Sequence, residues 1–209
     1  MTPDPSSPYF YRPPPGSGWL ASLAWRALRC WRWRTVLAGP LPRKCVIVFY
    51  PHTSNWDALV GLLTKWAFGL DVRWAAKDTL FRSPLAPLFR SLGGIPVNRR
   101  RRTGFSGAMG EAFAGRDDLR LVIEPEATRS YAPCWKSGFY HIARAAGVPL
   151  AFGFIDYSRR EIGFLGSLEP TGDVAADMAR IAAIYEGRVG RNPRQQGPVR
   201  LCEPTDARC

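Results

Sequence analysis

The sequence predicts an α/β fold in which a mainly parallel sheet is covered by helices on both faces. Short apolar segments rich in β-branched and aromatic residues alternate along the chain with segments whose apolar residues recur at helical spacing. The connections between these segments are short, as in β–α units. With 209 residues and 46% apolar content, the chain can form one substantial core but hardly two, so we expect a single main domain.

The first 43 residues are expected to lie outside the main domain. Residues 1–18 are rich in Pro, Ser and Gly and predict a flexible or extended arm. Residues 19–36 predict an amphipathic helix with apolar residues on one side and arginines, flanked by tryptophans, on another. Such a helix is typical of a membrane interface, where arginines meet anionic headgroups and indoles settle at the water–hydrocarbon boundary. The alternative is a helix packed on its own domain. Two prolines end the segment, so residues 19–43 form the helix and a linker.

The main domain is assigned to residues 44–190. Strands are expected at residues 45–50, 72–75, 94–97, 119–123 and 150–156. Helices are expected at residues 57–68, 85–92, 104–114, 137–146 and 175–185. The remainder, residues 191–209, is rich in Gly, Pro and Arg and predicts a loose C-terminal tail.

His52 and Asp57 are the residues best suited to chemistry. His52 follows an apolar strand segment on a turn, and Asp57 lies about one turn into the next predicted helix. From there the carboxylate can reach one ring nitrogen, fix the tautomer and raise the basicity of the other nitrogen. The pair is therefore a candidate for taking a proton from a hydroxyl. A single His–Asp spacing is a weak motif, so other segments must support this interpretation.

Three further segments follow the run YPHTSNWD at residues 50–57. They read GGIPVNR at residues 93–99, PEATRS at residues 125–130 and GVPLAF at residues 147–152. With these four blocks in this order, residues 44–165 resemble the glycerophospholipid acyltransferase family, whose bacterial type member is lysophosphatidic acid acyltransferase.

The resemblance implies a glycerol-3-phosphate acyltransferase-like fold and an enzyme that acylates a hydroxyl. The acyl group would come from acyl-CoA or acyl carrier protein, and the acceptor would be a lysophospholipid such as 1-acyl-glycerol-3-phosphate. His52 would be the general base and Asp57 its partner. The resemblance assigns the acceptor site to four residues: Arg99, Glu126, Thr128 and Arg129. For Glu126 a structural pairing with an arginine is the alternative. Neither a cofactor nor a metal is implied.

Two positions in the third block depart from the family pattern. Ala127 replaces the usual Gly, which matters if the position needs a positive φ or close backbone approach, because a Cβ disfavours both. Glu124 stands where the family usually has an apolar residue. One alternative is therefore a degenerate member that binds lipid but has lost transfer.

A formal charge of +12, from 29 basic against 17 acidic residues, favours anionic partners such as phospholipid headgroups or coenzyme A. No zinc-finger, helix-turn-helix or RNA-recognition motif is present, so nucleic acid is not an expected partner. A non-catalytic basic protein that binds lipid or nucleic acid remains the alternative function.

The five cysteines form neither a metal-binding pattern nor a disulfide scaffold, which predicts reduced thiols and a cytosolic setting. No stretch of about 18 apolar residues occurs, as a transmembrane helix would need. We therefore expect a peripheral protein on the cytoplasmic face of the cell membrane. The oligomeric state, the chain-length preference and the choice between the two acyl donors stay open.

Overall fold

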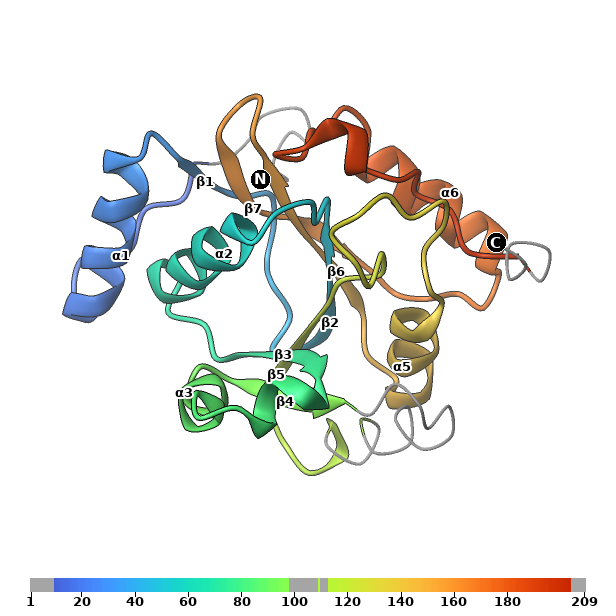
Figure 1. The fold of residues 1–209 in the computed structure, drawn as a ribbon, viewed down its shortest axis with the longest axis horizontal. Helices are drawn as coiled ribbons and strands as arrows, with labels where there is room; N and C mark the ends of the chain where they lie inside the picture. Colours follow the sequence, from blue (N-terminus) through green and yellow to red (C-terminus); the bar gives the residue numbers. More distant parts are fainter. Residues whose placement is uncertain (1–9, 98–108, 110–112, 204–209) are drawn as a thin grey trace.

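A seven-stranded sheet forms the centre of the molecule in the computed structural model, which describes residues 10–97, 109 and 113–203 (Figure 1). The strand order is β1-β7-β6-β2-β5-β3-β4, and every neighbouring pair is parallel except β6 and β7. The predicted α/β class is confirmed. The strands are β1 (Arg34–Leu37), β2 (Lys44–Tyr50), β3 (Val72–Lys77), β4 (Gly94–Val97), β5 (Leu119–Ile123), β6 (Leu150–Asp156) and β7 (Glu161–Leu168).

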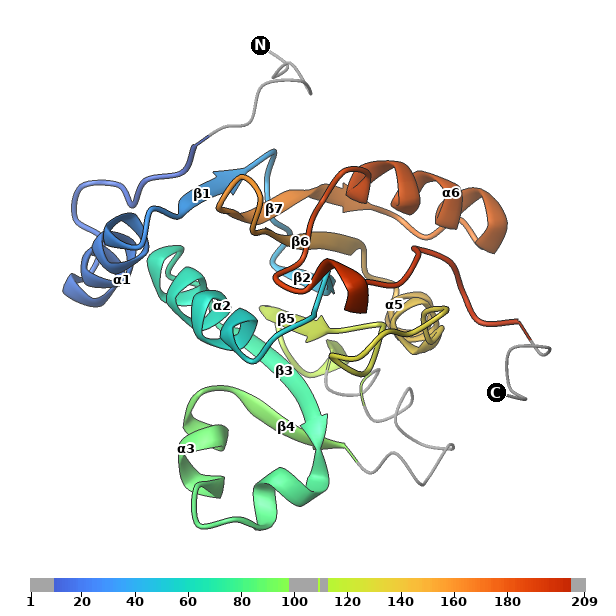
Figure 2. The same cartoon turned by 45° about the horizontal axis from the view of Figure 1, so that its top comes forward.

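Helices cover both faces of this sheet. In Figures 1 and 2, α1 and α2 lie beside one another, away from α5 and α6. The described helices are α1 (Trp19–Cys30), α2 (Trp56–Ala67), α3 (Ala86–Ser91), α5 (Gly138–Ala146) and α6 (Val174–Tyr185), with short 3-10 helices at Asp78–Arg82 and Pro193–Gln195. The helix expected at residues 104–114 falls largely outside the described residues.

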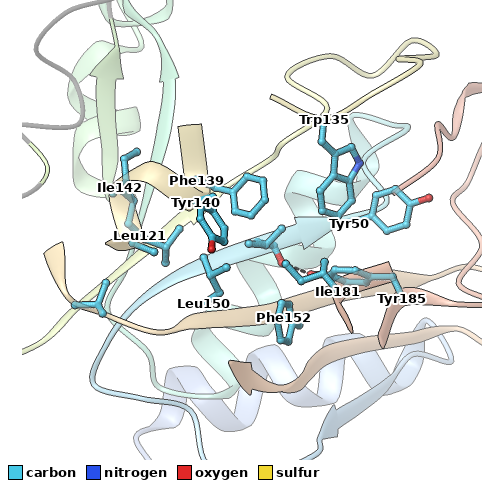
Figure 3. Packing of buried hydrophobic residues seen from close by; sticks show 14 of the residues in the cluster. Tyr50, Leu121, Trp135, Phe139, Tyr140, Ile142, Leu150, Phe152, Ile181 and Tyr185 are labelled. Carbon is cyan, nitrogen blue, oxygen red and sulfur yellow. Dashed lines mark hydrogen bonds between the residues drawn. The ribbon is translucent and has the colours of Figure 1, made fainter. Parts of the chain in front are cut away.

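Strand β2 is buried on both faces, as its continuous apolar sequence predicts for a central parallel strand. Val46 and Val48 pack with residues of α5 and α6 in the largest core cluster (Figure 3). Cys45 and Ile47 belong to a second cluster on the opposite face. This double burial fixes the strand, and with it the turn that carries His52.

The N-terminal helix is shorter than expected, and one of its faces packs on the domain, as the alternative interpretation predicts. It ends at Cys30, and Arg32 has a positive φ of 63°, after which the chain enters edge strand β1. Ala24 and Leu28 are buried in a cluster with Val60 of α2. Other apolar side chains of the segment are exposed, namely Trp19, Leu20, Leu23 and Trp31. The helix therefore packs on the domain through one face and leaves a second apolar face open.

Strand β7 was missed because its sequence contains two glycines that interrupt a strand pattern. One of them is required by packing: a Cβ at Gly163 would come within 1.9 Å of the Val36 carbonyl oxygen in β1. Gly163 therefore allows β1 to join the edge of the sheet.

The predicted loose tail is wrong for residues 191–203. The Tyr50 hydroxyl donates to the Gly197 carbonyl at 2.8 Å, and the Trp135 amide donates to the Arg200 carbonyl at 2.7 Å. Residues 204–209 lie outside the described residues. The expectation of reduced cysteines is wrong for Cys134 and Cys202, which form a disulfide. Backbone pairing, this bond and the packing of Val199 and Leu201 attach the segment to the core.

Candidate active site

The predicted site forms at the carboxyl ends of parallel strands β2 and β5. His52 lies on the turn between β2 and α2, and residues 124–130 follow β5 directly. Strand ends of this kind are where open α/β sheets bind ligands, because the loops converge there. The structure thus brings the first and third sequence blocks together.

His52 is buried, with 8% of its surface exposed, and it lies between two carboxylates. Its Nδ1 is 3.2 Å from Asp57 Oδ2, and its Nε2 is 3.4 Å from Glu124 Oε2. Burial alone would lower the pKa of His52, but the contact with Asp57 and the charges of Glu124 and Glu126 outweigh burial and raise the pKa above its ordinary value. The ring is therefore a stronger base than a free imidazole.

Asp57 is held by donors from three directions. Its Oδ2 accepts hydrogen bonds from the amides of Thr53 and Ser54, each at 2.9 Å, and its Oδ1 accepts one from the Tyr157 hydroxyl at 2.7 Å. These donors compensate the burial of the carboxylate and fix it beside His52 Nδ1. Tyr157 was not anticipated from the sequence, although its place just after buried strand β6 is a usable signal.

Glu126 stabilises the turn that carries His52. It is 3% exposed, and its Oε2 accepts a hydrogen bond from the His52 amide at 2.8 Å. The Gly197 amide donates to Oε1 at 3.5 Å. Burial raises the pKa of Glu126 to about 7, against the opposing effect of these hydrogen bonds. Both of these partners are backbone amides, so Glu126 is not paired with an arginine as the alternative expected.

The remaining predicted acceptor residues lie on the same loop or outside the described residues. Thr128 is exposed and its Oγ1 accepts from the Ser130 amide at 3.2 Å. Arg129 is exposed, and its guanidinium donates to the side-chain oxygen of Asn55 next to the start of α2. Arg99 lies outside the described residues, and the structure gives it no position.

Ala127 adopts a φ of 56°, in the left-handed region. The sequence had identified this position as one where a Cβ would matter if φ were positive. Its amide donates to the Glu124 carbonyl at 3.1 Å and closes a tight turn. The chain thus forms the glycine-type turn with an alanine.

The C-terminal segment completes the site. The Asn192 amide donates to Thr53 Oγ1 at 3.1 Å, and its side-chain nitrogen donates to the Thr53 carbonyl at 2.8 Å. Together with the contact between Gly197 and Glu126, these bonds hold the His52 turn from the opposite end of the chain. Nothing in the local sequence of residues 191–203 signals this role.

An apolar cavity of about 440 Å³ lies between α2 and the sheet. Its walls include Ile47, Leu62, Trp74, Phe89 and Phe164, and Asp57 and Glu124 also line it. The cavity therefore reaches the two carboxylates that flank His52. Among the residues the structure describes, no group of three or more His, Cys, Asp or Glu side chains is arranged to hold a metal ion.

The α/β sheet, the His–Asp pair at its strand ends and the adjoining apolar cavity define an enzyme-like domain. Residues 37–151 match the Acyltransferase family, which is more than half of the chain, so the protein belongs to this family of acyltransferases. The predicted resemblance to glycerophospholipid acyltransferases is confirmed at the level of the family.

The fold is similar to that of a solved acyltransferase structure. That structure is described as the 1-acyl-sn-glycerophosphate (LPA) acyltransferase PlsC from Thermotoga maritima, with a TM-score of 0.55 and 19% sequence identity. The match covers 80% of this chain and 74% of that chain. A comparison with curated proteins gave no match.

Proposed function

We propose that the protein is a peripheral membrane O-acyltransferase in which His52 is the general base. The acyl donor is acyl-CoA or acyl carrier protein, and the acceptor is the hydroxyl of a lysophospholipid, such as 1-acyl-glycerol-3-phosphate. The observation that carries the proposal is the position of His52. Asp57 lies beside Nδ1, and Glu124, which also lines the apolar cavity, lies beside Nε2.

The geometry supports a direct transfer. With Asp57 at Nδ1, the neutral ring carries its lone pair on Nε2, and this nitrogen takes the proton of the acceptor hydroxyl as its oxygen attacks the thioester carbonyl. The C–O bond forms, the C–S bond breaks, and the imidazolium returns the proton to the departing thiolate. Asp57 stabilises the charged ring during this step. Because a thioester is already activated, holding the two substrates together supplies much of the acceleration.

The cavity is suited to the hydrocarbon part of a substrate. Its wall is mainly apolar, and it begins at the carboxylates beside His52. An acyl chain in the cavity would bring the thioester carbonyl close to Nε2. Burial of methylene groups there would contribute about 0.8 kcal/mol each to binding.

Exposed apolar side chains support binding to a bilayer surface. Trp19 is 77% exposed. Trp31 follows α1 directly, and the centre of its ring is 6.5 Å from that of Trp56 at the start of α2. Leu85 and Leu88, at the start of α3, are exposed as well. Tryptophans at this density, with a net charge of +12, suit the interface of an anionic membrane. Among the described helices none has the length and apolarity needed to cross a bilayer.

The proposed location is the cytoplasmic face, since acyl-CoA and acyl carrier protein are cytosolic donors. The Cys134–Cys202 disulfide is unusual for a reducing compartment. Mass spectrometry of the protein extracted under alkylating conditions tests this point. A disulfide found intact in cells would count against the cytoplasmic face.

The test of the function is transfer of radiolabelled acyl groups from each donor to a panel of lysolipids in anionic vesicles. We expect product with the wild-type protein and one preferred donor. Binding of the protein to vesicles without product for any pair of substrates would contradict the enzymatic proposal and favour a non-catalytic lipid-binding role.

A further inference from the structure

We propose that Glu124 is a specificity-determining residue that selects acceptors with a hydrogen-bond donor, either an ammonium or a second hydroxyl, next to the reacting hydroxyl. The inference rests on the proposed function. It narrows the acceptor class, because it disfavours a phosphate monoester at the same place and so ranks 1-acyl-glycerol-3-phosphate below other acceptors of that class.

The position of Glu124 makes contact with the acceptor unavoidable. Asp57 occupies the Nδ1 side of His52, so the acceptor oxygen must approach Nε2 to within about 2.6–3.2 Å. Glu124 Oε2 lies 3.4 Å from that same nitrogen. A hydroxyl that reaches Nε2 therefore arrives beside the Glu124 carboxylate, and so do the groups on the neighbouring carbon.

Glu124 differs from the other two carboxylates around His52 in the hydrogen bonds that its carboxylate accepts. Asp57 accepts bonds from two amides and the Tyr157 hydroxyl, and Glu126 accepts bonds from two amides. Within the part of the chain that the structure describes, the Glu124 carboxylate has His52 as its polar partner. Its side chain is 41% exposed and lines the cavity, so it has acceptor capacity left for a ligand.

Glu124 is also fixed in place. It follows the last residue of β5 directly, and its carbonyl accepts the Ala127 amide in the tight turn. The side chain therefore projects from a rigid strand end. A residue so held contributes to selection more than one on a long loop would.

The sign of the selection follows from the charge. A carboxylate attracts an ammonium or hydroxyl donor and repels a phosphate, and a unit charge a few Å away in a partly exposed site changes binding by about tenfold. The glutamate therefore favours acceptors that carry such a donor over a phosphate monoester.

The test compares three acceptors of equal chain length: a 1-monoacylglycerol, a 2-amino-1-alkanol and 1-acyl-glycerol-3-phosphate. The proposal predicts that the wild-type protein has a higher kcat/KM for one or both donor-bearing acceptors than for the phosphate monoester. Glu124→Gln keeps the size of the side chain and removes the charge, and it should reduce that ratio about tenfold. Glu124→Leu, which replaces the carboxylate with an apolar side chain, should reduce the ratio at least as far.

Glu169→Gln is the matched control, because it removes the same charge from a site just after the far end of β7. Thermal unfolding shows whether each variant is folded. An unchanged ratio in both Glu124 variants, with transfer intact, would overturn the role of Glu124 and leave the proposed function standing. Failure of the wild-type protein to acylate any of these acceptors or other lysolipids would overturn both.

Discussion

His52 carries a raised pKa in the folded protein, and this has a direct consequence for rate. The proposed base acts only when its ring is neutral, so activity should rise with pH and level off above the pKa of His52. Because that pKa lies above the ordinary value of 6.5, half-maximal kcat/KM is expected on the alkaline side of 6.5.

The pH–rate profile of Glu124→Gln checks whether the charge of Glu124 contributes to the raised pKa of His52. Loss of one neighbouring negative charge lowers the pKa of His52, so the rising limb should move to lower pH. The groups that face the ring are Asp57, Glu124 and Glu126. A rising limb centred below 6.5 in the wild-type protein would contradict the raised pKa.

The substitution Ala127→Gly tests whether the alanine impairs this protein. Its φ of 56° disfavours a residue with a Cβ by about 1–2 kcal/mol. Glycine removes that cost but increases the freedom of the unfolded chain by about 0.4–1 kcal/mol. We therefore expect Ala127→Gly to raise the free energy of unfolding by about 0–1.6 kcal/mol, measured by denaturant titration. Inactive wild-type protein that gains transfer in this variant would support the degenerate alternative.

Among individual residues, the sequence predicted those that belong to a recognisable motif. The adjacency of His52 and Asp57 follows from their spacing across a strand–helix turn, and the resemblance pointed to Ala127. The partners of Asp57 and Glu126 are different in kind. Tyr157 comes from 100 residues away, and the partners of Glu126 are backbone amides, which no side-chain pattern encodes.

Helix α2 provides a test of the cavity. Gly61 lines it, and a Cβ at this position would meet no atom within 4 Å. Gly61→Leu has room for its Cβ and should fill part of the cavity, and it removes a helix glycine that costs about 1 kcal/mol. We expect a stable variant whose kcat/KM falls at least about tenfold for long-chain donors and far less for short-chain donors.

Gly138 offers the control for that experiment. It lies in helix α5, and a Cβ there would likewise meet no atom within 4 Å, but it does not line the cavity. Gly138→Leu should leave the chain-length profile unchanged. Equal profiles for Gly61→Leu and the wild-type protein would show that the acyl chain lies elsewhere.

Among the elements, those with strong periodicity were predicted well. The strands at Gly94–Val97, Leu119–Ile123 and Leu150–Asp156 have the expected bounds. The failures are β1 and β7 at one edge of the sheet. Their pairing depends on Gly163 allowing close approach of Val36, which is a tertiary contact rather than a local preference.

For the whole molecule, the Cys134–Cys202 disulfide joins positions 68 residues apart and closes the C-terminal segment onto the core. A loop of this length corresponds to about 4 kcal/mol in the chain-entropy treatment, of which about 2–4 kcal/mol is commonly observed. Cys202→Ser, or a reductant, should lower the free energy of unfolding by that amount. Acyl transfer should also fall, because the same segment contacts Tyr50 and Glu126.

Cys30→Ser is the control, since Cys30 is an exposed free thiol. It should leave the free energy of unfolding unchanged relative to the wild-type protein under the same redox conditions. Unfolding of the wild-type protein that is insensitive to reductant would contradict a stabilising role for the disulfide.

The global architecture was predictable because alternating strands and helices with short connections leave few alternatives to a parallel sheet. Closure of the chain was not. Residues 191–203 attach through backbone pairing, side-chain hydrogen bonds, one disulfide and the packing of Val199 and Leu201, whereas a composition rich in Gly, Pro and Arg gave the opposite expectation.

The most direct test of the central claim is the kcat/KM for acyl transfer of His52→Ala beside His141→Ala. His141 is the other histidine of the chain, and it is exposed on α5. Removal of a general base reduces turnover by about 10²–10⁴-fold. If His52 is the general base, His52→Ala shows that loss while it remains folded, and His141→Ala keeps near wild-type transfer. Transfer close to wild type in folded His52→Ala would contradict this role.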